Sequence, residues 1–88
     1  MKYVQHQQFT KHFQKRILNN HKLVKKYVER LELFINNPKN RTLKDHALTG
    51  NKKEYRSFWI TGDIRVTYKV ISNDLIQLYD IGSHNQVY

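Results

Sequence analysis

The 88-residue chain predicts one small domain over residues 1–88, and 39% hydrophobic residues are enough to bury a compact core. It has no cysteine, which excludes disulfides, thiolate chemistry and zinc–thiolate sites and leaves packing to hold the fold. Its 16 Lys and Arg against 7 Asp and Glu give a net charge of +9, which favours nucleic acid, an acidic protein partner, or both.

The chain opens with a stretch that favours a short edge strand, Met1 to Gln5, with Tyr3 and Val4 at its centre. Apolar side chains then recur at every fourth position and share one face of a helix, which we expect to run from about Thr10 to Leu18. These side chains are Phe9, Phe13 and Ile17.

A longer amphipathic helix is predicted next. Asn20 is a suitable N-cap for it, and the Asn37–Pro38 step ends it, because the residue before proline is forced out of helical geometry. Its apolar stripe consists of Val24, Tyr27, Val28, Leu31, Phe34 and Ile35. Two consecutive amphipathic helices predict an antiparallel helical hairpin.

Residues 41–53 are polar and show no periodicity, which predicts a long loop of the kind that often carries function. Strand-like runs follow at 55–60, 64–71 and 75–81, and turn residues separate them. The element order is therefore β-α-α-β-β-β. This order predicts an α+β fold in which the helical hairpin packs on one face of an antiparallel sheet.

Side chains in a strand point alternately to opposite faces, so the middle strand of this group has two distinct sides. The side toward the core should carry Ile64, Val66, Tyr68 and Val70, next to Phe58 and Ile60 of the preceding strand. The other side collects Asp63, Arg65, Thr67 and Lys69, together with Tyr55, Ser57 and Trp59. We therefore expect an exposed sheet face that is polar, basic and aromatic. Arg56 falls on the core side by the same alternation.

The polar residues at the strand ends suit chemistry on RNA. RNA can be cut without a metal by its own 2′-hydroxyl, which needs a base, an acid for the leaving 5′-oxygen, and a cation at the phosphate. His46 in the loop and His84 after the last strand are candidates for the proton-transfer roles, because histidine titrates near neutral pH. Arg65 could hold phosphate in a two-pronged grip.

Each of these residues also has a plainer interpretation. A loop histidine is usually a solvated surface residue, and Asp63 after Gly62 suits a turn. Arg65 and Lys69 suit an ordinary solvent face, and Tyr88 could be a frayed terminus. The net charge could belong to a basic surface that has no partner.

In order and spacing, the segment from Leu43 to Tyr88 resembles the RelE-type toxins of bacterial toxin–antitoxin pairs, within the RelE/ParE superfamily, and especially the YafQ-like branch. Those toxins carry a histidine in the loop before the sheet, an aspartate where the central strand starts, a histidine after the last strand, and a terminal aromatic. The matching residues are His46, Asp63, His84 and Tyr88. Arg65 matches the phosphate-gripping arginine of the wider RelE group, so the resemblance implies that these five residues are catalytic.

One position departs from the family pattern. YafQ-like toxins often carry another histidine on the strand before the aspartate, and Trp59 stands there, where it could stack on a base or on a partner. The remaining histidines, His6, His12 and His21, are interpreted as surface residues. Their spacing matches no zinc motif, so we expect neither a metal nor another cofactor.

The resemblance implies a ribosome-dependent endoribonuclease that cuts messenger RNA in the ribosomal A site. The residues expected to contact RNA are Lys44, Lys52, Lys53, Trp59 and Lys69. The resemblance also implies an acidic cognate antitoxin, with operator DNA contacted only through that antitoxin. The sequence shows neither a secretory segment nor an apolar run that could span a membrane, so a cytoplasmic protein without membrane contact is expected.

Two alternatives stay open. ParE-like toxins share the fold group and act on DNA gyrase, but they generally lack histidines at the positions of His46 and His84. The chain could also be a toxin relative that has lost its activity and serves as a binding module. Trp59 in place of histidine is the one feature that favours this second alternative.

Overall fold

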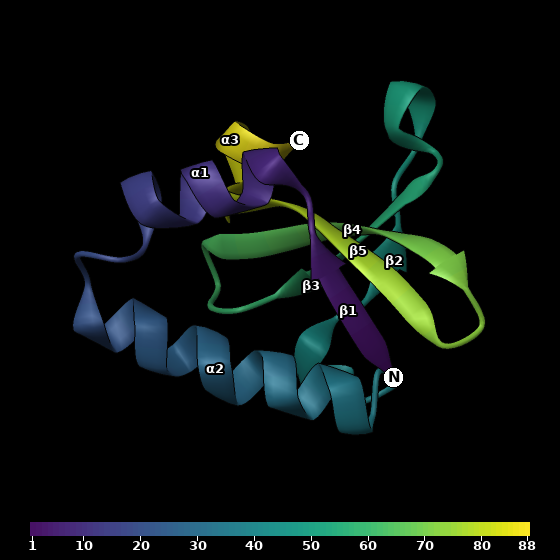
Figure 1. The fold of residues 1–88 in the computed structure, drawn as a ribbon, viewed down its shortest axis with the longest axis horizontal. Coiled ribbons are helices and arrows are strands. Elements are labelled where there is room, and N and C mark those ends of the chain that lie inside the picture. Colours follow the sequence, from purple (N-terminus) through teal and green to yellow (C-terminus); the bar gives the residue numbers. More distant parts are fainter.

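The computed structural model describes residues 1–88 and has the predicted α+β architecture (Figure 1). One sheet contains β1 (Lys2–Gln5), β2 (His46–Ala47), β3 (Tyr55–Trp59), β4 (Ile64–Ser72) and β5 (Leu75–Ser83), in the order β1-β5-β4-β3-β2. The helices are α1 (Gln7–Arg16), α2 (His21–Asn36) and α3 (His84–Val87). None of them has the length and apolar composition that crossing a membrane requires.

The first two helices follow the predicted pattern, although α1 both begins and ends earlier than expected, at Gln7 and Arg16. In α1 the side chain of His6 accepts a hydrogen bond from the Gln8 backbone N–H, so the helix begins at Gln7 rather than near Thr10. In α2 the side chain of Asn20 caps the first turn, as predicted, by accepting from the Leu23 N–H. That helix ends at Asn36, before Asn37 and Pro38, in agreement with the effect of proline on the preceding residue.

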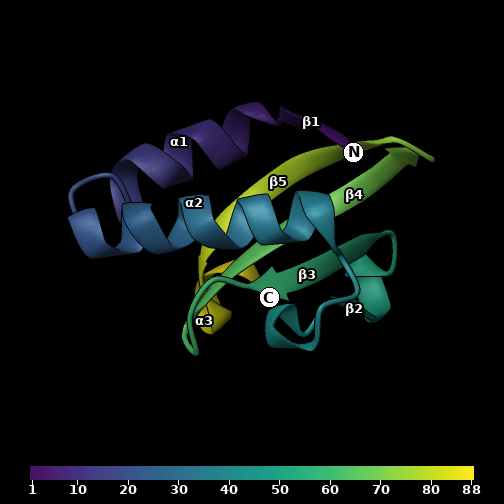
Figure 2. The same cartoon turned by 90° about the horizontal axis from the view of Figure 1, so that it is seen from below.

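The hydrophobic core lies between α2 and one face of the sheet. Figure 2 shows α2 crossing the strands, which appear in the order β1, β5, β4, β3, β2. Phe34 of α2 stacks on Phe58 of β3, with ring centroids 4.3 Å apart. The predicted core positions Phe58, Ile60 and Val66 are each no more than 1% exposed. Val70 differs, at 53% exposure, because it lies toward the end of β4, where a register shift interrupts the pairing with β5.

The sheet departs from a fully antiparallel arrangement at one edge. β1 pairs with β5 in parallel, with Lys2 opposite Leu75 and Gln5 opposite Leu78. A parallel pair needs a long connection, and here both helices and the other strands intervene in the chain. After Gln5 the chain enters α1, which packs against β5.

The face opposite α2 is less exposed than the strand alternation predicts. Ser57, Arg65 and Thr67 are on this face, and they are 0%, 9% and 2% exposed. The expectation of an exposed face therefore holds only for part of it, since Tyr55, Trp59 and Lys69 are half-buried and Asp63 is exposed. The physical reason for the buried part is α3, which is absent from the predicted element order and packs against β4 and β5. Figure 1 shows α3, and the segment that joins β2 to β3, on the side of the sheet away from α2.

Candidate functional site

The structure brings two of the predicted histidines and the terminal tyrosine to one pocket. The pocket has a volume of about 460 Å³ and lies between β2, the segment that follows it, and α3. Its lining consists of His46, Ala47, Leu48, Thr49, Lys52, His84 and Tyr88. Residues nearly forty positions apart in the sequence thus line one cavity, which also contains Lys52.

His46 is fixed by its own loop. Its Nδ1 lies 2.8 Å from the backbone carbonyl oxygen of Lys44, and since a carbonyl can only accept, Nδ1–H is the donor. The neutral ring therefore keeps its lone pair on Nε2. Lys44 adopts a left-handed backbone conformation, with φ of 50°, and this bend directs its carbonyl back toward the imidazole. The short strand β2 then pairs His46 with Ser57 of β3.

Tyr88 lies between the two histidines. Its ring is edge-on to His84, with centroids 4.5 Å apart, and edge-on to His46 at 6.2 Å. The Tyr88 hydroxyl hydrogen-bonds to the hydroxyl of the fully buried Ser57. The expectation of a frayed terminus is therefore wrong, because both the ring and the hydroxyl of Tyr88 are held.

Lys52 supplies the pocket with a positive charge. Its Nζ donates to the backbone carbonyl of Val87 at 2.7 Å and to that of Tyr88 at 3.4 Å. These bonds tie the loop before β3 to α3, which carries His84. An ammonium group held among carbonyl oxygens is well placed to attract an anion that enters the pocket.

A row of polar side chains crosses the sheet beneath this site. His46, Ser57, Thr67 and Asp80 are consecutive partners across β2, β3, β4 and β5. Ser57, Thr67 and Asp80 are buried, and the Thr67 hydroxyl has no hydrogen-bond partner. Burying a polar group without a hydrogen-bond partner costs free energy. Buried polar groups therefore usually bond to their neighbours and hold them in place.

The far end of this row is a charged cluster that the sequence interpretation missed. Asp80, which is 6% exposed, accepts hydrogen bonds from Nδ1 of His12 at 2.6 Å and from the Ile81 N–H at 2.8 Å. Arg16 lies 3.4 Å from the same carboxylate oxygen and also donates to the Ile81 carbonyl at 3.1 Å. His12 is thus not a plain surface residue. An aspartate within the apolar run of β5, and two basic residues four apart on α1, were the available signals.

Arg65 and Asp63 do not line the pocket. The Arg65 guanidinium donates to the backbone carbonyls of Thr61 and Gly62 and lies 3.8 Å from the centroid of the Trp59 ring. Asp63 is exposed in the turn before β4, where its N–H donates to the Thr61 hydroxyl. These contacts hold the turn before β4 and place the Arg65 guanidinium outside the pocket, and the phosphate grip expected of Arg65 stays a prediction.

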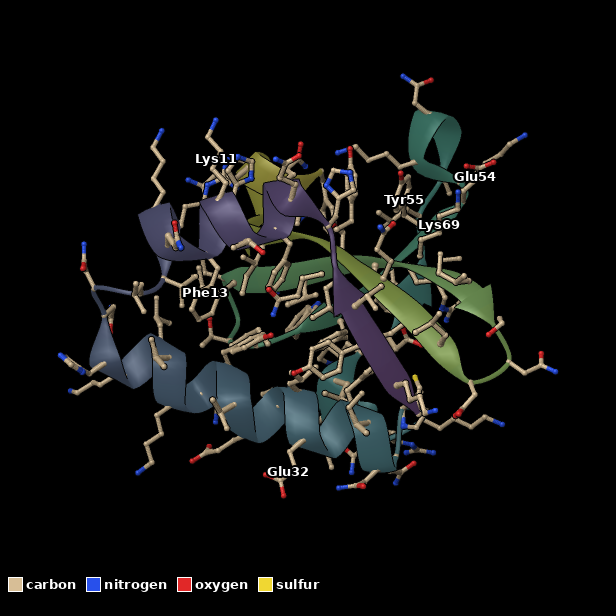
Figure 3. The ribbon with its side chains drawn as sticks, in the orientation of Figure 1. Lys11, Phe13, Glu32, Glu54, Tyr55 and Lys69 are labelled. Atoms are coloured by element: carbon tan, nitrogen blue, oxygen red, sulfur yellow. The ribbon has the colours of Figure 1, made fainter.

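The three remaining lysines that were expected to contact RNA, Lys44, Lys53 and Lys69, have different environments. Lys44 lies over the same Trp59 ring, with Nζ 5.1 Å from its centroid. Lys53 is exposed in the segment before β3. Lys69 forms an exposed ion pair with Glu54 at 3.5 Å, a contact that contributes little to stability in water. Figure 3 shows Lys69, Glu54 and Tyr55 close together near the end of β3.

Arg56, which strand alternation places on the core side, forms a polar triad with Asp45 and Tyr68. Its guanidinium donates to Asp45 at 3.0 Å, and the Tyr68 hydroxyl donates to the other oxygen of that carboxylate at 2.6 Å. The hydrogen bond to Asp45 raises the pKa of Arg56 above its ordinary value. Burial, and then the hydrogen bond to Asp45, raises the pKa of Tyr68 above its ordinary 10.0. The triad fixes the loop just before His46.

Comparison with known proteins gives the family. The model of the YafQ family, described as the bacterial toxin of type II toxin–antitoxin systems, matches residues 1–88. The chain belongs to this toxin family. Among curated proteins, none matches closely enough to count as a relative.

Solved structures of related toxins have the same fold. YafQ from Escherichia coli strain BL21(DE3) is 26% identical, with a TM-score of 0.82 over 98% of this chain and 96% of that one. A copper-bound mutant toxin from Helicobacter pylori is 28% identical, with a TM-score of 0.74 over 100% and 99%. The E. coli DinJ–YafQ complex is 26% identical, with a TM-score of 0.79 over 98% and 96%. The predicted RelE-like fold and the toxin family are thereby confirmed.

Proposed function

We propose that this toxin is an endoribonuclease that cuts messenger RNA on the ribosome by attack of the RNA's own 2′-hydroxyl, without a metal. The observation that carries the proposal is the pair of imidazoles, His46 and His84, which line one basic pocket with Tyr88 between them. Two proton-transfer groups and a cation at one cavity are what this reaction needs. The family membership agrees with this activity.

The geometry favours distinct roles for the two histidines. Because Nδ1–H of His46 donates to the Lys44 carbonyl, the Nε2 lone pair of the neutral ring is free to accept the 2′ proton. His84 then protonates the leaving 5′-oxygen, and Lys52 stabilises the charge that develops on the phosphate. The 2′-oxygen forms a bond to phosphorus as the bond from phosphorus to the 5′-oxygen breaks, which leaves a 2′,3′-cyclic phosphate and a 5′-hydroxyl.

The supporting residues differ from the set that the resemblance implies. Arg65 and Asp63 both lie outside the pocket that Lys52 lines, and the Arg65 guanidinium faces the turn and Trp59. We therefore assign the phosphate contact to Lys52 and give Tyr88 the task of holding both imidazoles. Trp59, in place of another histidine, does not remove a proton-transfer group from this pocket.

The partner proposed for this chain is a cognate antitoxin. The E. coli relative has been seen in a complex of DinJ with YafQ. A net charge of +9 suits both an acidic antitoxin segment and ribosomal RNA, since both select a positive surface. The chain would then contact operator DNA only through the antitoxin.

The decisive experiment is translation in a cell-free extract with the purified toxin, followed by mapping of messenger RNA 5′ ends. We expect discrete fragments with 5′-hydroxyl ends. His84→Ala should lower cleavage by about a hundredfold to ten-thousandfold, the usual cost of losing an acid–base group. His21→Ala is the matched control, because His21 is exposed at the start of α2 and away from the pocket.

Three results would contradict the proposal. A folded His84→Ala protein that cuts as fast as the parent would remove His84 from the mechanism. Intact messenger RNA, together with loss of supercoiling activity in a DNA gyrase assay, would favour the ParE-like alternative. Intact messenger RNA and unaffected gyrase would favour a toxin relative that acts only as a binding module.

A further inference from the structure

An aromatic row lies on the sheet face away from α2 and is not needed for the chemistry proposed above. Tyr55 of β3 and Tyr79 of β5 have ring centroids 4.7 Å apart, and the His6 ring lies 5.0 Å from Tyr79. All three residues are partly exposed. Partly exposed rings that touch across a sheet offer flat faces to a ligand as well as packing contacts.

A β-bulge creates this row. Thr67 pairs with Asp80, whereas Tyr68 pairs with Leu78, so Tyr79 has no partner on β4. The extra residue lets Tyr79 and Asp80 lie on the same face, although they are adjacent in the chain. Bulges commonly redirect a side chain next to a functional site. Here the redirected ring meets Tyr55 over the middle of the sheet.

The row lies close to the candidate active site. Tyr55 precedes Ser57 by two residues on β3, and Ser57 holds the Tyr88 hydroxyl. Because a strand rises by about 3.4 Å per residue, Tyr55 and Ser57 are roughly 7 Å apart along β3. That length is comparable with one nucleotide step of an extended single strand, so a chain bound in the pocket would bring its neighbouring base to the row.

Two lysines flank the row, and one of them, Lys69, is partly neutralised by its ion pair with Glu54. Lys69 is the strand partner of Tyr55, and His6 and Lys11 line a polar pocket of about 330 Å³ at the start of α1. His6 accepts the Gln8 N–H through Nδ1, which leaves the other ring nitrogen of the neutral form as a donor. Figure 3 shows Lys11 and Tyr55 on the same side of the molecule, away from Glu32 on α2.

We propose that Tyr55 and Tyr79, flanked by His6, form a base-stacking subsite for the nucleotide next to the one that is cut. Single-stranded RNA is the occupant that the observations favour, because it combines flat aromatic bases with a negative backbone. Stacking on aromatic rings, with lysines at the phosphates, is a common way to bind single strands. This inference rests on the proposed function, and it adds a subsite for the substrate.

The test is direct binding of a fluorescently labelled hexaribonucleotide whose 2′-O-methyl sugars prevent cleavage, measured by fluorescence anisotropy at low salt. Tyr79→Ala should weaken binding by about 5- to 150-fold, and Tyr55→Ala similarly, because one base loses its stacking partner. Tyr79→Phe should bind like the parent. Tyr3→Ala is the control, since Tyr3 is an exposed tyrosine that lines a pocket beside α2.

The outcomes separate this inference from the proposed function. Equal binding by Tyr79→Ala, Tyr55→Ala and the parent would overturn the subsite, and so would a parent that does not bind the RNA. A Tyr79→Ala protein that loses its antitoxin but keeps RNA binding would make the row a protein-docking surface and also overturn the proposal. Stacking-dependent RNA binding by a parent that cuts no messenger RNA would support the subsite while contradicting the proposed cleavage. Circular dichroism verifies that each variant is folded.

Discussion

At the level of single residues, Tyr88 shows how one side chain serves both packing and the site. Its ring contacts His84 and its hydroxyl bonds to Ser57, so the hydroxyl is committed inside the protein. A phenol engaged in this way is a poor candidate for direct proton transfer. The ring, in contrast, is positioned to restrain both imidazoles.

Tyr88→Phe and Tyr88→Ala separate these two contributions. Tyr88→Phe leaves the buried Ser57 hydroxyl unpaired, and we expect it to lower the free energy of unfolding by about 1–3 kcal/mol while RNA cleavage falls less than about tenfold. Tyr88→Ala removes the ring and should reduce cleavage strongly. Denaturant unfolding and the cell-free assay measure the two effects. Loss of cleavage in Tyr88→Phe as severe as in His84→Ala would instead assign chemistry to the hydroxyl.

Tyr68 predicts how stability depends on alkaline pH. Because the folded protein raises the pKa of Tyr68, its stabilising contribution is complete below the unfolded value near 10.0 and is lost as pH rises through the higher folded value. The free energy of unfolding should therefore fall above about pH 10. Tyr68→Phe should flatten this fall. The test is to measure tyrosinate absorbance of the folded protein and the free energy of unfolding over the same alkaline pH range. Ionisation of all six tyrosines in the folded protein near pH 10 would contradict the raised pKa of Tyr68.

At the level of elements, the join between β5 and α3 decides where His84 lies. Gly82 is at this join, and a Cβ placed on it would lie 2.6 Å from the Gln86 side-chain oxygen and 2.8 Å from Nη1 of Arg16. That side-chain oxygen accepts the Ser83 N–H and so starts α3. Arg16 reaches the join from α1 and also holds the Ile81 carbonyl.

Gly82→Ala should therefore displace the side chains of Gln86 and Arg16, and with Gln86 the hydrogen bond that caps the start of α3. We expect a cleavage rate lowered at least about tenfold, a distance-sensitive loss typical of misplaced catalytic groups, with a small loss of stability. Gly62→Ala is the matched control, because no atom lies within 4 Å of its added Cβ. The His84 imidazole resonances in NMR spectra should shift only in Gly82→Ala. Full cleavage by Gly82→Ala would show that α3 tolerates movement.

The sequence predicted an element well where local signals determine it. In α2 these signals are the apolar repeat, the Asn20 cap and the proline after the last turn. The prediction failed where distant segments decide the outcome. The burial of Arg65 depends on α3 and on Trp59, and the pairing of His12 with Asp80 depends on α1 lying along β5. The sequence shows the charged residues themselves, but no local pattern says which of them pair. His46 and His84 were singled out from the sequence as proton-transfer candidates, whereas their meeting in one pocket and the place of Lys52 beside them came from the fold.

At the level of the whole molecule, net charge predicts how a partner is captured. The charge of +9 should steer an acidic antitoxin toward the toxin, and salt screens that attraction. The association rate with the product of the adjacent gene should therefore fall as salt is raised, while dissociation changes less. Stopped-flow fluorescence from low to high salt measures both rates. An association rate that is flat over that range would show that the basic surface does not capture this partner.

The division of each strand into two faces has a consequence for how such a toxin can change over generations. On β3, Phe58 packs against the core, whereas its neighbours Ser57 and Trp59 face the site side. Mutations on one set of positions are selected for folding, and those on the other for what the toxin binds. A lineage can therefore alter what the toxin binds through substitutions on the site side of the sheet while the core side stays almost unchanged. The buried row of Ser57, Thr67 and Asp80 is the exception, because substitutions at these positions affect both folding and the site.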